Sequence, residues 1–281
     1  MKLLRHGDAG VEKPGLMDAH GTARDLSAHI AEIDAAGLNP HKLAELRGID
    51  PASLPAVPAG TRYGPPVANV GKVVCIGLNY SDHAKETNMP IPEEPIVFMK
   101  GTSAITGPND DVVLPRGAEK GDWEVELGVV IGRHAKYVSE ADALDYVAGY
   151  CVVNDVSERH LQLEGTGQWV KGKTCDTFCP FGPWLVTADE VPDPQALDMW
   201  LDVDGHRYQN GNTRTMIFSV AQIVSYLSGF VSLYPGDLIA TGTPPGVGAG
   251  LKPPVFLKPG NVMHVGIEGL GEQTQNVLRD E

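Results

Sequence analysis

Residues 123–132 read WEVELGVVIG, and this stretch predicts a strand that runs into the protein core. It alternates acidic and apolar residues and then continues as an apolar run, so we expect a strand over 124–131. Successive side chains of a strand point to opposite faces, which places Glu124 and Glu126 on one face and apolar side chains on the other. Two like charges beside a core are costly unless a cation neutralises them. A solvated polar strand face is the alternative interpretation.

A third carboxylate stands at the end of the next apolar run. Residues 149–155, GYCVVND, predict a buried strand that ends in Asp155. Three carboxylates with no His or Cys among them favour a hard cation, with Mg²⁺ first and Mn²⁺ or Ca²⁺ next. Glu124, Glu126 and Asp155 are therefore the predicted metal ligands.

The segment 79–86, NYSDHAKE, carries a candidate acid–base pair. We expect a short helix over 79–88, on which His83 and Glu86 share a face within hydrogen-bonding reach. A carboxylate that fixes the tautomer of an imidazole makes it a better general base, although the local sequence leaves a plain surface pair equally open. The proline-rich segment that follows, about 84–95, is expected to be a mobile lid.

The composition argues against several classes of function. The chain has 281 residues, 42% of them hydrophobic, which is enough for a substantial core. Its 22 Lys and Arg against 36 Asp and Glu give a net charge of −14, which disfavours nucleic-acid and membrane-surface binding. No stretch has the length and apolarity of a signal peptide or a spanning helix. Four cysteines without a zinc or disulfide spacing lead us to expect reduced thiols and a cytoplasmic protein.

The composition and the pattern of apolar residues divide the chain into two parts. Residues 1–66 predict a small N-terminal domain, with short strands, helical stretches over 27–36 and 41–47, and a linker with five prolines. Residues 67–281 predict the catalytic domain, in which strands dominate and one strong later helix covers 219–227. The strands do not alternate regularly with helices, so we expect a mixed, β-rich α+β fold. The further strands are expected at 73–77, 96–100, 147–155, 184–187, 199–203, 238–241 and 262–267.

Five motifs in order resemble the fumarylacetoacetate hydrolase family over about residues 66–270. They are GLNYSDHAKE (77–86), WEVELGVVIG (123–132), VVNDVSERHLQ (152–162), KGKTCDTFCPFGP (171–183) and IATGTPPGVG (239–248). The resemblance implies the family's mixed β-roll with few helices and a homodimer. It also implies that the Glu-x-Glu pair and the later Asp bind Mg²⁺ or a similar ion.

The same resemblance assigns roles to six further residues. His83 matches the family's catalytic His, Glu86 its partner in the acylpyruvase-like branch, and Lys173 the catalytic Lys of the Gly-Lys motif. For substrate binding, Gln162 and Thr243 match contacting residues and Arg159 matches a recurrent Arg whose role stays open.

The short N-terminal part resembles the smaller bacterial branch, which includes 2,4-diketo-3-deoxy-rhamnonate and -fuconate hydrolases and acylpyruvases. No acid lies within 71–79, where larger members carry an extra metal ligand. The resemblance implies a hydrolase acting on carbon–carbon bonds in ketonic substances, which cleaves C3–C4 of a small anionic 2,4-dioxo acid and releases pyruvate. A ureidoglycolate lyase-type C–N lyase, a decarboxylase and an isomerase are the alternatives.

Two other classes of protein are alternative interpretations of the sequence. LRHGDA at 4–9 resembles the phosphohistidine signature of histidine phosphatases, but it begins after three residues and runs into Pro14 and Gly15. A non-catalytic, metal-stabilised binding protein would keep the three acids, and the His83–Glu86 pair argues against it.

Overall fold

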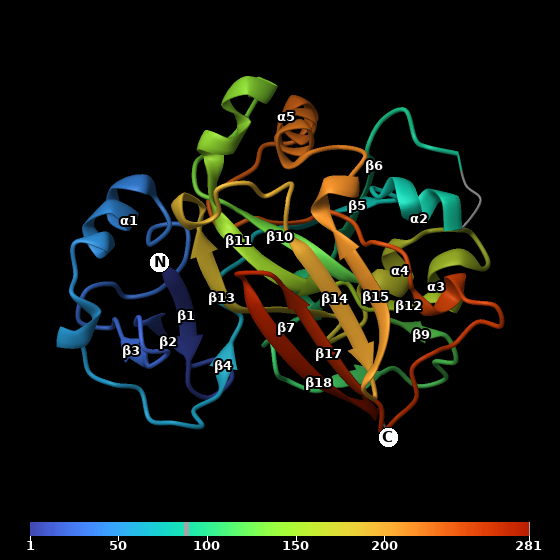
Figure 1. Cartoon of the computed structure of the whole chain (residues 1–281), viewed down its shortest axis with the longest axis horizontal. Helices are drawn as coiled ribbons and strands as arrows, with labels where there is room; N and C mark the ends of the chain where they lie inside the picture. Colours follow the sequence, from blue (N-terminus) through green and yellow to red (C-terminus); the bar gives the residue numbers. More distant parts are fainter. Residues whose placement is uncertain (87–89, 281) are drawn as a thin grey trace.

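The computed structural model describes residues 1–86 and 90–280, and most of this chain is built on two β-sheets (Figure 1). The larger sheet has the order β3-β2-β1-β13-β11-β10-β16-β5-β6, with β4 beside β1 and β7 beside β13. Its strands are β1 (Lys2–His6), β2 (Lys13–Met17), β3 (Ala23–Asp25), β4 (Tyr63–Gly64), β5 (Val73–Gly77), β6 (Ile96–Lys100), β7 (Ile105–Thr106), β10 (Val125–Ile131), β11 (Val147–Asn154), β13 (Cys179–Thr187) and β16 (Leu238–Ala240).

The second sheet has the order β15-β14-β17-β18-β8 and packs on one face of the first. Figure 1 shows its long strands lying across β10, β11 and β13. Its strands are β8 (Val112–Leu114), β14 (Asp198–Val203), β15 (His206–Asn212), β17 (Val262–Ile267) and β18 (Gly271–Arg279). A short pair, β9 (Gly121–Asp122) and β12 (Ser157–Glu158), lies next to the end of β10. The prediction of a mixed, β-rich fold with few helices is confirmed.

The described α-helices are short and lie around the sheets. They are α1 (Pro40–Arg47), α2 (Ser81–Glu86), α3 (Arg159–Leu163), α4 (Val170–Lys173) and α5 (Val220–Phe230). Helix α5 begins with a capping box in which Ser219 and Gln222 bond each other's backbone N–H groups, which satisfies donors that a helix start leaves open. Figure 1 shows α2, α3 and α4 together at the end of the molecule opposite α1 and β1–β3. In the described parts of the chain, no helix has the length and apolarity that a bilayer crossing requires.

Strand β10 lies between two hydrophobic cores, and its side chains point alternately into one and the other. Val125 and Ile131 belong to the core between the two sheets, whereas Val130 belongs to a second core beneath the N-terminal segments. Because side chains alternate along a strand, Glu126 points to the same face of the sheet as Val130. Glu126 is the second residue of β10 and therefore lies near the edge of that face.

The first 66 residues extend the larger sheet. Strand β1 pairs antiparallel with β13, and Leu3 and Leu26 lie in the same core as Cys151 and Phe181 of the central strands. Whether this part is a domain of its own, with a boundary at residue 66, stays a prediction. The proline-rich stretch is irregular apart from a 3₁₀ turn over Pro51–Ser53 and the two-residue β4.

The predicted helix over 27–36 is wrong, because this segment is a series of turns. Asp34 Oδ1 accepts hydrogen bonds from the backbone N–H groups of Ala36 and Gly37, and the Ile33 carbonyl accepts one from Ala68 N–H. These local side-chain bonds and the long-range backbone bond compete with helix formation.

Other predicted elements differ mainly at their ends. The second predicted N-terminal helix is α1, and the expected helix over 79–88 is α2 as far as Glu86. Its last two residues, and part of the expected lid over 84–95, fall at residues 87–89 and lie outside the described residues. Strands β15 and β18 were not predicted from the sequence.

Candidate active site

Two neighbouring strands bring the three predicted metal ligands together. Val125 of β10 pairs with Asn154 of β11, and the ladder continues one step further, where Asp155 N–H donates to the Glu124 carbonyl at 2.9 Å. Carboxylate oxygens of Glu124, Glu126 and Asp155 all lie within 4.8 Å of one another. All three residues are buried, and Asp155 is completely so.

Buried cations surround two of these carboxylates. Lys173 donates from Nζ to Glu124 Oε2 at 2.6 Å and to Asp155 Oδ2 at 2.8 Å. Arg159 Nη2 lies 2.7 Å from Glu124 Oε1. Lys100 donates to Asp155 Oδ1 at 2.5 Å and to a backbone carbonyl at 3.0 Å. Charge-assisted hydrogen bonds of this kind are what make it possible to bury so many ionised groups.

The third carboxylate is held differently. Glu126 accepts a hydrogen bond from Gly242 N–H at 2.8 Å, and no Lys, Arg or His among the described residues forms an ion pair with it. Burial, with the negative charges of Asp155 and Glu124, raises the pKa of Glu126 well above its usual range. Burial would raise the pKa of Glu124 as well, but the charges of Lys173 and Arg159 outweigh it and lower this pKa to about 2. Three convergent carboxylates, one of which has no ion-pair partner among the described residues, suit a divalent cation such as Mg²⁺ or Mn²⁺.

Arg159 lies at the centre of a buried hydrogen-bond network on α3. It donates from Nε to Asp122 Oδ2 at 2.8 Å and from Nη1 to Gln162 Oε1 at 2.9 Å. Asp122 also accepts from the backbone N–H groups of Gly248 and Ala249, at 2.7 and 3.0 Å. The network therefore connects α3 to the loop after β16.

The predicted acid–base pair comes from α2. His83 Nδ1 lies 3.0 Å from Glu86 Oε2, and the Glu86 side chain is 25% exposed. The backbone N–H of Gly246 reaches both Glu86 oxygens, at 3.2 and 3.3 Å. Glu86 thus bonds to His83 and to the loop that carries Thr243.

Thr243 lies on that loop with its hydroxyl engaged by the protein. It donates to the Val125 carbonyl at 2.9 Å and accepts from Gln209 Nε2 at 2.7 Å. Because a hydroxyl has one hydrogen to donate, Thr243 has an acceptor lone pair to offer a ligand in this arrangement. Its predicted substrate contact stays a prediction.

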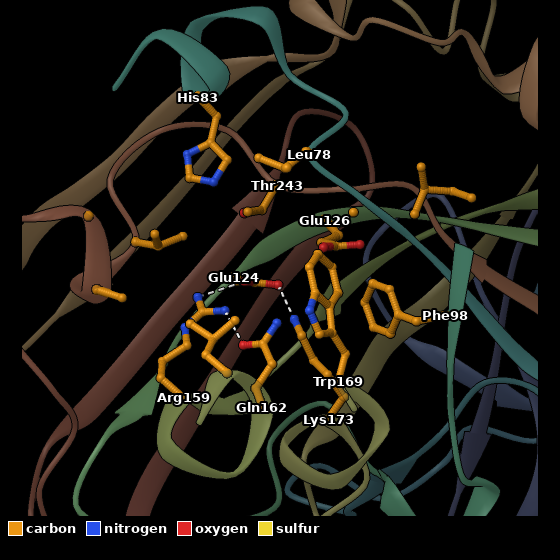
Figure 2. A pocket seen from close by; sticks show the side chains of 16 residues that line it. Leu78, His83, Phe98, Glu124, Glu126, Arg159, Gln162, Trp169, Lys173 and Thr243 are labelled. Carbon is orange, nitrogen blue, oxygen red and sulfur yellow. Dashed lines mark hydrogen bonds and ion pairs between the residues drawn. The ribbon is translucent and has the colours of Figure 1, made fainter. Parts of the chain in front are cut away.

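A cavity of about 280 Å³ brings these groups together (Figure 2). His83, Thr243 and the pair Glu124 and Glu126 line it, while Asp155 and Glu86 support lining residues from behind. Figure 2 shows Arg159 and Gln162 along one side of the cavity and Phe98 and Trp169 along the other. The remaining lining residues are Ile76, Gly77, Leu78, Leu163, Lys173, Val247, Ala249 and Gly250.

Two charged groups at this site were missed in the sequence. Lys100 is the last residue of β6, and Asp155 comes directly after β11. The same pattern that indicated Asp155, a charged residue at the end of an apolar strand, could therefore have indicated Lys100. Asp122 directly precedes the Trp-Glu-x-Glu motif, and its role depends on Arg159, 37 residues later. That contact is not readable from local spacing.

The phosphatase-like motif is not arranged for phosphate binding. Arg5 Nε and Nη2 bind both oxygens of Glu32 at 2.8 and 2.9 Å, and Nη2 also lies 3.3 Å from Glu12. Two carboxylates on one guanidinium repel a phosphate group and occupy the donors that would hold it.

Comparison with known proteins identifies the family. Residues 72–278 match the model described as fumarylacetoacetate (FAA) hydrolase C-terminal. A Burkholderia lata protein named "putative hydrolase" is 64% identical over 277 residues, which are 98% of each chain.

Two solved structures show the range of reactions among similar proteins. One is 2-hydroxyhepta-2,4-diene-1,7-dioate isomerase from Mycobacterium marinum, with a TM-score of 0.80, 35% identity and coverage of 100% of this chain and 99% of that one. The other is maleylpyruvate hydrolase from Sphingobium sp. SYK-6 in complex with manganese(II) and pyruvate, with a TM-score of 0.84, 29% identity and full coverage of both chains. The chain, with its five motifs around one cavity, therefore belongs to the fumarylacetoacetate hydrolase family of enzymes.

Proposed function

We propose that this protein is a divalent-metal-dependent hydrolase that cleaves the C3–C4 bond of a small 2,4-dioxo acid and releases pyruvate. One observation carries the proposal: Glu124, Glu126 and His83 line the same cavity, and Asp155 and Glu86 complete the carboxylate cluster and the His–Glu pair from behind it. The solved maleylpyruvate hydrolase, whose structure contains manganese(II) and pyruvate, supports the same kind of reaction. We also propose that the enzyme is a homodimer.

Glu124, Glu126 and Asp155 would hold the cation, with Mg²⁺ or Mn²⁺ as the first candidates. When bound, the cation would withdraw electron density from the oxygens of a 2-oxo acid and so ease the build-up of negative charge. Lys173, which lies between Glu124 and Asp155, adds a fixed positive charge at the same place.

The His83–Glu86 pair supplies the proton acceptor. With its Nδ1 proton held by Glu86, His83 takes a proton from water through Nε2 as the water oxygen bonds to C4. The C3–C4 bond then breaks, its electron pair passes to C3, and C3 is protonated. The products are pyruvate and the carboxylic acid derived from the acyl group, so atoms and charges balance.

Two other reactions use the same groups. An isomerase or a decarboxylase would also place negative charge next to a 2-oxo group, and an isomerase is among the similar solved structures. A ureidoglycolate-type C–N lyase remains the more distant alternative.

The test is a pyruvate-release assay over a panel of 2,4-dioxo acids, with added Mg²⁺ or Mn²⁺ and with a chelator. We expect release of pyruvate that requires the cation and that falls by about 10²–10⁴-fold in His83→Ala. Loss of substrate with carbon dioxide release and no pyruvate would identify a decarboxylase. Turnover of ureidoglycolate alone would replace the proposal with the lyase.

A further inference from the structure

The cavity has two chemically different halves. The polar half carries Glu124, Glu126, Arg159, Gln162 and Lys173. The other half is formed by six apolar side chains from four parts of the chain: Ile76, Leu78, Phe98, Leu163, Trp169 and Val247. In Figure 2, Lys173 lies between the acids and the aromatic pair, with its Nζ 5.1 Å from the centre of the Phe98 ring. The halves therefore meet at Lys173.

The apolar half forms a wall of side chains that pack against one another. The Phe98 and Trp169 rings meet edge to face with centroids 5.4 Å apart, a favourable aromatic geometry. Gly77 makes room for this pair, because a Cβ at Gly77 would lie 2.6 Å from the Trp169 ring. Leu78 lines the cavity from a backbone with φ of +50°, a conformation that is uncommon for a residue with a side chain.

The cations of the cavity are already paired on its polar half. Arg159 holds Asp122 and Glu124, and Lys173 holds Glu124 and Asp155. His83 is engaged with Glu86. The six apolar side chains of the other half include no positively charged group, so that half of the described lining offers no partner to a second carboxylate of a substrate. A charge buried there would lose its hydration without a partner.

We propose that the group on C4 of the substrate is small, uncharged and apolar, and that it packs against Phe98, Trp169 and Leu163. This inference rests on the proposed function, because it assumes that the reacting end of the substrate lies at the carboxylates. A polyhydroxylated or carboxylate-bearing chain is disfavoured, since the wall offers its hydroxyl or carboxylate groups no matching partners. The cavity volume of about 280 Å³ lies just below the roughly 300–1,000 Å³ typical of small-molecule sites, which favours a short acyl group.

The experiment compares kcat/KM within two matched pairs of substrates. The first pair is 7-methyl-2,4-dioxooctanoate and 2,4-dioxoheptanedioate, which differ by a terminal isopropyl group in place of a carboxylate. The second pair is 2,4-dioxoheptanoate and its 5,6-dihydroxy derivative. Consumption of the dioxo acid and release of pyruvate are measured separately, so the preference can be read whichever reaction takes place.

We expect the apolar member of each pair to be preferred by about 100-fold or more, since discrimination against a group left without partners is at least of this order. Each methylene added to a straight acyl chain should raise kcat/KM about fourfold until the cavity is full. A preference for the carboxylate or the diol would overturn the inference. Apolar preference with consumption but no pyruvate would overturn the proposed reaction alone, and no consumption of any dioxo acid would overturn both.

A positive charge introduced into the apolar wall should change the ratio of kcat/KM between the apolar and the carboxylate substrate. Leu163 lines the cavity and is 54% exposed, so Leu163→Arg can fold and bring a cation to the apolar half. Val170→Arg is the matched control, because Val170 is 44% exposed and does not line the cavity. We expect Leu163→Arg to shift the ratio toward the carboxylate substrate by more than about tenfold and Val170→Arg to shift it less than about twofold. Equal shifts in both variants would mean general electrostatic attraction and would contradict the assignment of the wall.

Discussion

Replacing Glu126 and Asp155 separately should distinguish metal binding from folding, because the two carboxylates are held differently. Glu126 accepts one hydrogen bond, from Gly242 N–H, which the carbonyl oxygen of a Gln could also accept. Asp155 is fully buried with Lys100 on one oxygen and Lys173 on the other. Both Glu126→Gln and Asp155→Asn should lose the cation, but only the second leaves two buried ammonium groups short of negative charge.

The expected stability changes follow from this difference. Removing one partner of a buried ion pair costs about 3–5 kcal/mol, which we expect for Asp155→Asn without metal. For a chain of this size each kcal/mol corresponds to roughly 2–4 °C, so its Tm should fall by roughly 6–20 °C. Glu126→Gln removes a carboxylate that two neighbouring carboxylates repel, so its free energy of unfolding should stay within about 1 kcal/mol of wild type or rise.

The assay combines thermal unfolding in chelator with calorimetric titration of Mn²⁺ and Mg²⁺. In wild type, a cation at 100 times its Kd should add about 2.7 kcal/mol of stability, and neither variant should gain it. Wild-type Mn²⁺ affinity in Glu126→Gln would refute the assignment of this carboxylate as a ligand. Equal stability of the two variants in chelator would refute the charge-pairing argument.

Three further predictions concern the acid–base pair, the acid limit of stability and the apolar wall. His83→Ala should lower single-turnover rates by about 10²–10⁴-fold, Glu86→Gln by less, and the double variant by little more than His83→Ala; additive losses would show that the two residues act independently. The pKa of Glu124 lies near 2, below its ordinary 4.5, so its ionised form stabilises the fold above about pH 4.5 and this contribution is lost as pH falls toward 2. The stability gap between wild type and Glu124→Gln in urea unfolding should therefore shrink over that range, and a constant gap would contradict the shift. Gly77→Ala should displace the Trp169 ring and cost about 1–3 kcal/mol, which tryptophan fluorescence and urea unfolding would show; an unchanged spectrum and stability would contradict the close contact.

The sequence by itself was sufficient for the strands that carry the candidate metal ligands. Alternation at Glu124 and Glu126, and the apolar run before Asp155, are local patterns with a period of two, and the structure has strands directly beside these residues. The β-rich fold class followed for the same reason. The helix predicted over 27–36 is wrong because Asp34 and Ala68 bond to backbone groups of this segment. The helix propensity of the segment does not report such bonds.

Only the tertiary structure decided which charges meet at the carboxylates and what lies opposite them. Lys100 reaches Asp155 across 55 residues and Arg159 reaches Asp122 across 37, because strand pairing and the packing of α3 bring these segments together. The apolar wall depends in the same way on Gly77, which makes room for the side chain of Trp169, the residue that precedes α4. Period and composition report which face a side chain occupies within its own element, whereas contacts between elements depend on the packing of the whole chain.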